Sequence, residues 1–251
     1  MTFIMTNNDI TAAKLPEVAI VGSGNVATHL LNALASHALL HQVNPHTLEQ
    51  MPGHADIVII SVRDSAIAEV AAKLKGDFGI VCHTSGSVPM TELRGCCSNY
   101  GVFYPLQTFT KGVPLDYSEI PFFIEGNSPE TAGTLSELAK KVSPNVREAD
   151  SASRKVLHLA SVFACNFSNA LVGIADDILK ESGMDYRVLL PLLRQTVAKL
   201  DRLTPKEAQT GPAIRRDFPV MSAHTEMLRD KGLQNLTEIY EDISSEIIKN
   251  R

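Results

Sequence analysis

The sequence contains no tryptophan and only four cysteines among its 251 residues. These cysteines, Cys82, Cys96, Cys97 and Cys165, form no C-x-x-C pair, and adjacent Cys96 and Cys97 cannot easily bridge each other. Sparse, unpaired thiols of this kind are typical of reduced cysteines in a cytosolic protein. We therefore expect neither disulfides nor a metal site.

The sequence also lacks the features of exported, membrane or nucleic-acid-binding proteins. No uninterrupted apolar run approaches the roughly 18 residues that a membrane-spanning helix requires. Residues 1–15 have no basic start followed by an apolar stretch, so they predict a flexible tail and not a signal peptide. The net charge is −5, without a basic half that would mark nucleic-acid binding. We expect a cytoplasmic protein that binds a small-molecule substrate, with neither a nucleic acid nor a membrane as partner.

Short β-branched runs alternate with helical patterns in residues 16–150. The run Ile57–Ile60 is apolar without interruption, as in strands that are buried on both faces of a parallel sheet. The alternation therefore predicts an α/β domain with a doubly wound, mostly parallel sheet. The predicted strands are Glu17–Val21, Leu39–Asn44, Asp56–Val62, Gly79–Thr84, Gly101–Pro105, Ile120–Glu125 and Asn145–Glu148. The predicted helices are Val26–Ser36, Ser65–Leu74 and Pro129–Val142.

No strand pattern follows Asp150, and we place the start of an all-α helical domain, residues 151–251, at this point. Apolar residues at helical spacing predict a long first helix from Ser151 to Ser182, ended by Gly183. This helix is apolar almost all round, which indicates burial inside the domain or in a subunit interface. We therefore predict a homodimer formed through the helical domain. Further helices are predicted over Asp185–Leu200, Val220–Asp230 and Leu236–Asn250, with a break over Leu203–Pro219.

A glycine-rich turn follows the first predicted strand. The residues Gly22-Ser23-Gly24-Asn25-Val26-Ala27 fit the G-x-G-x-x-G/A fingerprint of dinucleotide-binding domains. Gly22 would allow the tight turn, Gly24 would let a pyrophosphate approach the backbone, and Ala27 would let the helix pack closely on the strand. The N–H groups that begin the helix would bind the phosphates. The alternative is a tight strand–helix turn that binds no ligand.

The end of the second strand indicates which dinucleotide is bound. An acidic residue usually binds the adenosine ribose there, but this strand ends at Asn44 and the nearest acid is Glu49. The missing carboxylate removes a repulsion against a 2′-phosphate, to which Asn44 could hydrogen-bond. We therefore expect NADP(H) to be favoured over NAD(H), modestly, because no arginine lies nearby.

The ends of the third and fourth strands supply the other candidate cofactor-binding residues. Val62, Arg63 and Asp64 follow the third strand at the carboxyl edge of the sheet, where ligands bind in such folds. Asp64 has the alternative role of N-cap for the next helix. Ser85 and Gly86 follow the fourth strand, where small polar residues suit a nicotinamide ribose, although an ordinary polar loop would have the same composition.

Five motifs together resemble a known family: the fingerprint, His83–Ser87, Tyr104–Phe109, His158–Asn169 and Gln209–Asp217. Over about residues 16–245 the chain is similar to bacterial Rossmann-like proteins with an uncharacterised C-terminal domain. More distantly it resembles β-hydroxyacid dehydrogenases, pyrroline-5-carboxylate reductases and deazaflavin-dependent NADP reductases. The resemblance implies a Rossmann-type sheet followed by a helical domain like that of 6-phosphogluconate dehydrogenase. It also implies an NADP-dependent oxidoreductase whose helical domain forms a dimer.

The long helix departs from the β-hydroxyacid dehydrogenases at one position. Those enzymes carry a K-x-x-N pattern with lysine as acid/base, and the matching stretch here is Asn166-Phe167-Ser168-Asn169. Asparagine can orient a carbonyl group but cannot shuttle a proton at neutral pH. Asn166 and Asn169 are therefore candidate catalytic residues that orient the substrate. His158, eight residues earlier and near the same helix face, is the candidate acid/base. The alternative is that the three side chains bond one another or nearby backbone.

The remaining candidates are substrate-binding residues. Tyr104 and Gln107 lie in one of the family motifs. In the polar break Gln209–Asp217, Gly211 fixes an unusual backbone path and Thr210 and Arg215 could face a ligand, although a helix–helix connector with solvated arginines would have the same composition. An arginine there would suit a substrate carboxylate or phosphate. The leading hypothesis is an NADP(H)-dependent oxidoreductase that acts on a small polar substrate in a cleft between the domains. The alternative is a non-catalytic dinucleotide-binding sensor or a partner-binding dimer.

Overall fold

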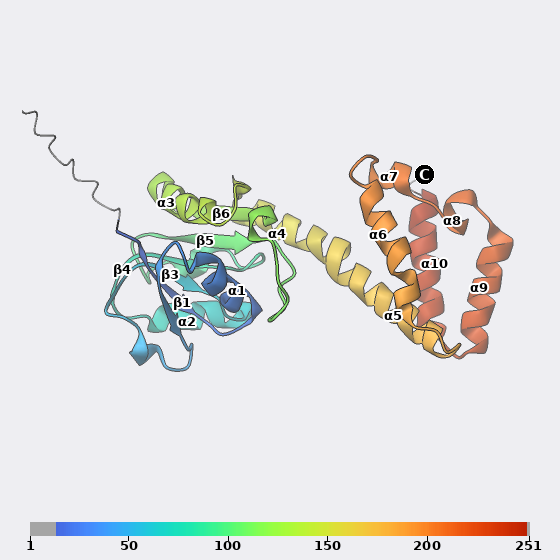
Figure 1. The fold of residues 1–251 in the computed structure, drawn as a ribbon, viewed down its shortest axis with the longest axis horizontal. Coiled ribbons are helices and arrows are strands. Elements are labelled where there is room, and N and C mark those ends of the chain that lie inside the picture. Colours follow the sequence, from blue (N-terminus) through green and yellow to red (C-terminus); the bar gives the residue numbers. More distant parts are fainter. Residues whose placement is uncertain (1–13, 250–251) are drawn as a thin grey trace, which may run out of the picture. The chain divides into compact units, whose positions relative to one another are not determined.

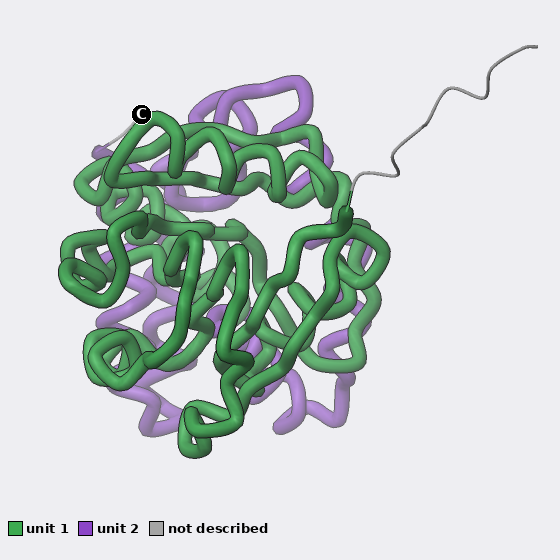
Figure 2. The backbone as a smooth tube through the Cα atoms, turned by 90° about the vertical axis from the view of Figure 1, so that its left-hand side faces the viewer, with its two compact units in different colours: residues 1–169 green, residues 170–251 purple. Residues whose placement is uncertain are grey.

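The computed structural model describes residues 14–249, which fall into two compact units (Figure 2). The units meet in the sequence between Asn169 and Ala170. This division lies later than the domain boundary that we placed at Asp150, because one continuous helix extends across it. Residues 1–13 of the predicted flexible tail and Asn250 of the last predicted helix lie outside the described residues.

The first unit is built on one seven-stranded sheet with the order β2-β1-β3-β4-β5-β6-β7 (Figure 1). All neighbouring strands are parallel except β5 and β6, which pair antiparallel. The strands are β1 Glu17–Val21, β2 Leu39–Val43, β3 His54–Ile60, β4 Asp77–His83, β5 Tyr100–Pro105, β6 Phe122–Gly126 and β7 Val146–Glu148. The predicted doubly wound, mostly parallel sheet is thus confirmed.

Each central strand sends alternate side chains to opposite faces of the sheet. In β1, Val18 and Ile20 face α1 (Asn25–Leu34) and α3 (Pro129–Lys140), whereas Ala19 and Val21 face α2 (Ile67–Lys73). Helices therefore cover both faces of the sheet. This explains the uninterrupted apolar sequence of the central strands, since burying apolar surface on both sides stabilises the layers.

The long helix that begins at Ser151 is not a regular α-helix throughout. It consists of α4 (Ser151–Ser161), a π-helical segment (Val162–Phe167) and α5 (Ser168–Lys180). The prediction of one uninterrupted α-helix was therefore wrong over the π-helical segment. Because a π-helical turn holds an extra residue, it rotates the following side chains relative to those in α4.

By length and composition alone, the helix Ser151–Lys180 could cross a membrane. Our search for an uninterrupted apolar run did not find it, because Ser161, Asn166 and Asn169 interrupt the apolar residues. One helix of this kind is weak evidence for a membrane protein, although none of its most apolar stretch is buried within the chain, unlike the core helix of a soluble protein.

The second unit is all-α, as the sequence predicts, and comprises α5, α6 (Leu190–Lys199), α7 (Pro205–Ala208), α8 (Pro212–Arg215), α9 (Phe218–Asp230) and α10 (Gln234–Lys249). Helix α10 packs against α8 and α9. The predicted break before Pro219 holds the short helices α7 and α8. They are joined by Gly211, whose φ of +108° favours a residue without a side chain.

Candidate functional site

A pocket of about 1420 Å³ lies at the carboxyl edge of the sheet in the first unit. Its lining comes from the segments that follow β1, β2, β3, β4 and β5, and from α2 and α4. The lining includes Gly22–Val26, Pro45, His46, Glu49, Ser61–Ala66, Lys73, Lys75, Thr84–Gly86, Tyr104, Gln107, Phe109 and His158. The parallel strands thus bring to one edge most of the residues predicted to bind a cofactor.

Gly22 occupies a turn that no other residue could adopt without strain. Its φ is +147°, and a Cβ atom there would lie 2.1 Å from the carbonyl oxygen of Ser61. The same Cβ would meet Ala27 at 3.5 Å, and Ala27 has no exposed surface. These two small residues therefore allow β1, β3 and the start of α1 to approach closely.

Gly24 keeps the first turn of α1 open to a ligand. It is the N-cap of α1, and no heavy atom of residues 14–249 lies within 4 Å of the position of its absent Cβ. No described side chain caps this helix end, so its first N–H groups remain available. An open backbone surface with uncapped N–H groups fits the diphosphate of a dinucleotide.

Tyr104 and His158 face each other in the wall of this pocket. The Tyr104 hydroxyl lies 3.3 Å from Nδ1 of His158, and the two rings are 6.3 Å apart at 73°. Gly86 lies directly against the pair: a Cβ there would come within 2.9 Å of both polar atoms. Burial raises the pKa of Tyr104, which keeps its phenol protonated at neutral pH. The pair therefore places a phenol that can donate a proton beside an imidazole that can pass one on, inside a ligand-sized cavity.

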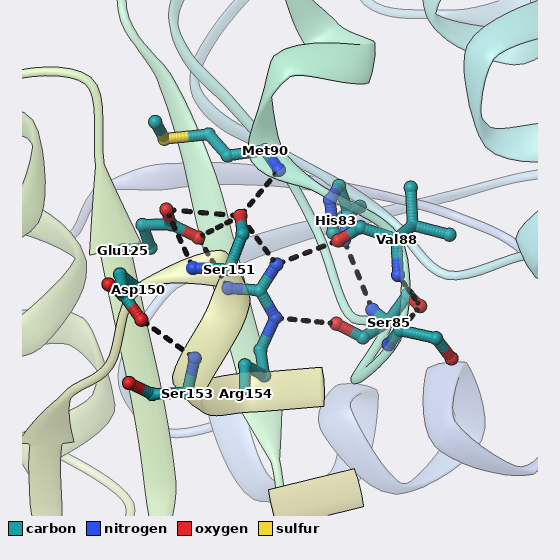
Figure 3. Close-up of polar contacts among 10 residues, drawn as sticks. His83, Ser85, Val88, Met90, Glu125, Asp150, Ser151, Ser153 and Arg154 are labelled. Carbon is teal, nitrogen blue, oxygen red and sulfur yellow. Dashed lines mark hydrogen bonds and ion pairs between the residues drawn. The ribbon is translucent and has the colours of Figure 1, made fainter. Parts of the chain in front are cut away.

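A buried polar cluster fixes the start of α4 against the loop after β4 (Figure 3). Arg154 has no exposed surface, forms an ion pair with Glu125, and donates to the carbonyl oxygens of Ser85 and Val88 at 3.1 and 2.7 Å. The Ser151 hydroxyl donates to the Glu125 carboxylate at 2.8 Å. Because His158 lies one helical turn after Arg154, this cluster also sets where His158 meets the loop.

His83, at the end of β4, is fully buried beside this cluster. Its Nδ1 accepts a hydrogen bond of 3.1 Å from the N–H of Ser85, so the ring is neutral with its proton on Nε2. Within residues 14–249, Nε2 is the one buried side-chain N or O atom without a hydrogen-bond partner. Burial, helped by the nearby Arg154 charge, lowers the pKa of His83 to about 4. His83 is therefore a structural neutral histidine and not a proton donor.

Most of the predicted cofactor residues line the pocket, but two do not. Val62, Arg63, Asp64, Ser85 and Gly86 all line it. Asp64 does not cap a helix; its carboxylate accepts a hydrogen bond of 3.0 Å from the Ser87 hydroxyl, which ties the loops after β3 and β4 together.

The predicted residues outside the lining have other neighbours. Ala27 lies beneath the turn, as its packing role requires. Asn44 is exposed, and its Oδ1 accepts from the N–H of His46 at 2.9 Å. Among the described residues, Pro45 and His46 line the pocket in its place.

The predicted catalytic residues are not brought together. His158 lines the pocket, whereas Asn166 and Asn169 are exposed and do not line it. Asn166 and Asn169 lie eight and eleven residues after His158, about two and three turns further along the helix, beyond the segments that line the pocket. Thr210, Gly211 and Arg215 belong to the second unit, where the side chains of Thr210 and Arg215 are exposed.

Sequence reasoning missed several residues that shape the pocket. Lys73 and Lys75 line it, and Arg154 and Glu125 hold its loop. An arginine within a mostly apolar helical repeat was a signal that could have identified Arg154, since such a charge must find partners if it is buried.

The sheet, its helices and the fingerprint turn define a Rossmann-type α/β protein that carries an additional helical unit. Residues 120–247 match the model of a family described as "Domain of unknown function (DUF2520)". The match spans half of the chain, and the protein belongs to this family. No curated protein matches the sequence.

Solved structures support the same assignment. The "putative NADP oxidoreductase BF3122" from Bacteroides fragilis is 37% identical, with a TM-score of 0.85 over 94% of this chain and 98% of that chain. Protein TM1727 from Thermotoga maritima is 22% identical, with a TM-score of 0.70 over 93% and 97% of the two chains. A reductive aminase from Aspergillus terreus, in complex with NADPH and ethyl levulinate, is 12% identical, with a TM-score of 0.65 over 93% and 95%. Pyrroline-5-carboxylate reductases also share the fold, as the sequence predicts.

Proposed function

We propose that the protein is an NADP(H)-dependent oxidoreductase that acts on a small polar substrate beside Tyr104 and His158. The observation that carries the proposal is that one pocket holds both the uncapped fingerprint turn and this Tyr–His pair. The similarity to the Bacteroides protein, described as an NADP oxidoreductase, supports the same cofactor class.

The chain's own residues supply binding and proton transfer. Gly24 and the first turn of α1 hold the diphosphate, and Ser85 and Gly86 border the site of the nicotinamide ribose. When bound, the reduced nicotinamide supplies a hydride to a polarised carbon. Tyr104 donates its hydroxyl proton to the heteroatom on that carbon, and a proton on Nδ1 of His158 replaces it. The distance of 3.3 Å between the Tyr104 hydroxyl and Nδ1 of His158 is in the range found before a substrate tightens such contacts.

The proposed preference for NADP(H) over NAD(H) rests on the residues after β2. No acid ends this strand, and His46, Lys73 and Lys75 line the pocket. Cationic and polar groups favour a 2′-phosphate, whereas the acid expected for NAD(H) would repel it. Glu49 and Glu69 also line the pocket, and the Glu69 carboxylate accepts from Lys73 at 2.6 Å, which limits the preference. Titrating NADPH and NADH by calorimetry tests it: a lower dissociation constant for NADH contradicts the preference.

The test of catalysis is to follow the absorbance of reduced nicotinamide against small oxo-acids, imines and a deazaflavin. With a substrate found, Tyr104→Phe should lower kcat by about a hundredfold, because it removes the proton donor but keeps the ring. His158→Gln should lower kcat less, and Gln234→Ala, at an exposed position at the start of α10, serves as a control. Equal kcat for Tyr104→Phe and the unmodified protein would remove Tyr104 from the mechanism.

A non-catalytic sensor is the second candidate, favoured by asparagine at position 166 where related dehydrogenases carry the catalytic lysine. Measuring NADPH binding and turnover, in the unmodified protein and in Asn166→Lys, distinguishes the two functions. A sensor binds NADPH but turns over no member of the panel, and its NADPH affinity is the same in Tyr104→Phe.

We also propose that the protein forms a homodimer through its helical part. Large apolar side chains are exposed on the helix that begins at Ser151, among them Val156, Leu159 and Phe163, with exposed fractions of 69%, 59% and 63%. On α6, Leu192 and Val197 are exposed to similar degrees. Exposed apolar surface of this extent is typical of an interface. Sedimentation equilibrium should give twice the chain mass, and a single-chain mass at micromolar concentration contradicts the proposal.

A further inference from the structure

A loop after β5 lies against the fingerprint turn at several points. The Lys111 Nζ donates to the carbonyl oxygen of Ser23 at 2.6 Å, and the Asn25 amide donates to the carbonyl oxygen of Phe109 at 2.9 Å. Phe109 and Gln107 line the same pocket as Ser23 and Asn25. Gln107 and Phe109 therefore form part of the pocket wall next to the fingerprint turn, and Lys111, which is exposed and not among the lining residues, contacts that turn at Ser23.

His29 anchors this segment from beneath. This side chain is buried on α1, and its Nε2 donates to the carbonyl oxygen of Thr110 at 2.9 Å. Its Nδ1 accepts from the Tyr117 hydroxyl at 3.0 Å, and its ring lies 5.1 Å from that of Phe109. These contacts fix the backbone on both sides of Lys111, which keeps the lysine next to the turn.

The site needs a cation that the fingerprint itself does not supply. The stretch from Gly22 to Ala27 contains no basic residue, and the chain carries a net charge of −5. A helix N-terminus contributes only about half a positive charge toward a diphosphate that carries two negative ones. An ammonium group has three N–H donors, and the structure describes a partner, Ser23, for one of those of Lys111. Two donors and a full charge therefore remain at the turn.

We propose that Lys111 is a ligand of the cofactor's diphosphate, held at the fingerprint by the segment 107–111 and its anchor His29. This inference rests on the proposed binding of a nicotinamide dinucleotide. It adds a cation from a distant part of the sequence to a site otherwise built from backbone N–H groups. The second function of Lys111 is to join Ser23 to the loop, which shapes the site before the cofactor arrives.

The experiment measures NADPH binding to the full chain by calorimetry at several salt concentrations. Lys111→Met should raise the dissociation constant about tenfold, as expected for one lost charge-assisted contact. Lys111→Arg, which keeps the charge, should stay within about threefold of the unmodified protein. Lys141→Met is the matched control, because Lys141 is an exposed lysine at the end of α3 and its loss changes the net charge equally.

Salt dependence separates a phosphate contact from a purely structural role. If Lys111 binds the diphosphate, NADPH affinity in Lys111→Met should fall less steeply with salt than in the unmodified protein. Equal dissociation constants in Lys111→Met and Lys141→Met overturn the proposal while leaving dinucleotide binding intact. A weaker affinity with an unchanged salt slope, or with no recovery in Lys111→Arg, also overturns it. Absence of NADPH and NADH binding in the unmodified protein overturns both this inference and the proposed function.

Discussion

Arg154 and Glu125 form a buried ion pair that joins the first turn of α4 to the end of β6. The arginine has no exposed surface, and the carboxylate also accepts from the N–H and the hydroxyl of Ser151. The other guanidinium donors are used by backbone carbonyl groups of the loop after β4. Both charges are therefore satisfied by several partners, which is the condition under which burial of an ion pair is tolerated.

Breaking this pair should be far more damaging than breaking an exposed one. Arg154→Ala leaves the Glu125 carboxylate without its cation, and we expect the free energy of unfolding to fall by about 3 kcal/mol. The control is Arg229→Ala, whose partner Glu241 lies at 2.7 Å with both side chains about half exposed. That variant should lose less than about 1 kcal/mol. Urea unfolding followed by circular dichroism measures both losses. Equal losses would show that the buried pair stabilises the fold no more than the exposed pair does.

His83 should make the first unit less stable in mild acid. The pKa of His83 is lowered to about 4 in the folded protein, chiefly by burial, so the unfolded chain binds a proton that the folded chain excludes. The contribution is constant above about pH 6.5, and the free energy of unfolding falls by about 1.4 kcal/mol per pH unit between pH 6.5 and 4.

The measurement is urea unfolding at half-unit pH steps, for the unmodified protein and for His83→Asn. The difference between their profiles should be flat from pH 7 to 8, which is the internal control, and should shrink as the pH falls below 6.5. If the two profiles stay parallel down to pH 4, His83 does not cause the loss of stability in mild acid.

The sequence allowed the sheet and the fingerprint to be predicted because both depend on local patterns. Doubly buried strands such as Ile57–Ile60 must be apolar, and the turn at Gly22 requires a glycine. The π-helical segment could not be predicted, because Val162–Phe167 carries the same apolar spacing as a regular helix. The segment interrupts the regular helix between His158 and Asn169, and Asn166 lies within it.

Contacts between distant segments were also beyond sequence reasoning. Lys111 lies in a loop of ordinary polar composition, and nothing nearby indicates that its ammonium group meets Ser23, 88 positions earlier. The partner of Asp64 was missed for the same reason, since an acid before a helix is most often an N-cap. In both cases the three-dimensional arrangement of the sheet edge decides the contact.

The two fingerprint glycines should respond differently to an added methyl group. Gly22→Ala places Cβ against the Ser61 carbonyl at a φ of +147°, so we expect a loss of several kcal/mol in the free energy of unfolding. Gly24→Ala meets no described atom within 4 Å and has an ordinary φ of −74°, so stability should change by less than about 0.5 kcal/mol. NADPH affinity, however, should fall at least tenfold in Gly24→Ala, because the methyl group occupies the approach of the diphosphate. Unchanged affinity, measured by calorimetry, would place the diphosphate elsewhere.

Gly86 should be required for the Tyr104–His158 pair. A methyl group at this position would lie 2.8 Å from Cζ of Tyr104 and 2.9 Å from Nδ1 of His158, so Gly86→Ala must push the two side chains apart. The control is Gly133→Ala within α3, where no described atom lies within 4 Å and helix propensity should add about 0.5–1 kcal/mol of stability. Nuclear magnetic resonance of the labelled histidine ring reports on the contact: the His158 resonances should shift in Gly86→Ala and in Tyr104→Phe, but not in Gly133→Ala. If Gly86→Ala leaves those resonances in place, the loop yields instead of the pair, and Gly86 does not hold the geometry on which proton transfer depends.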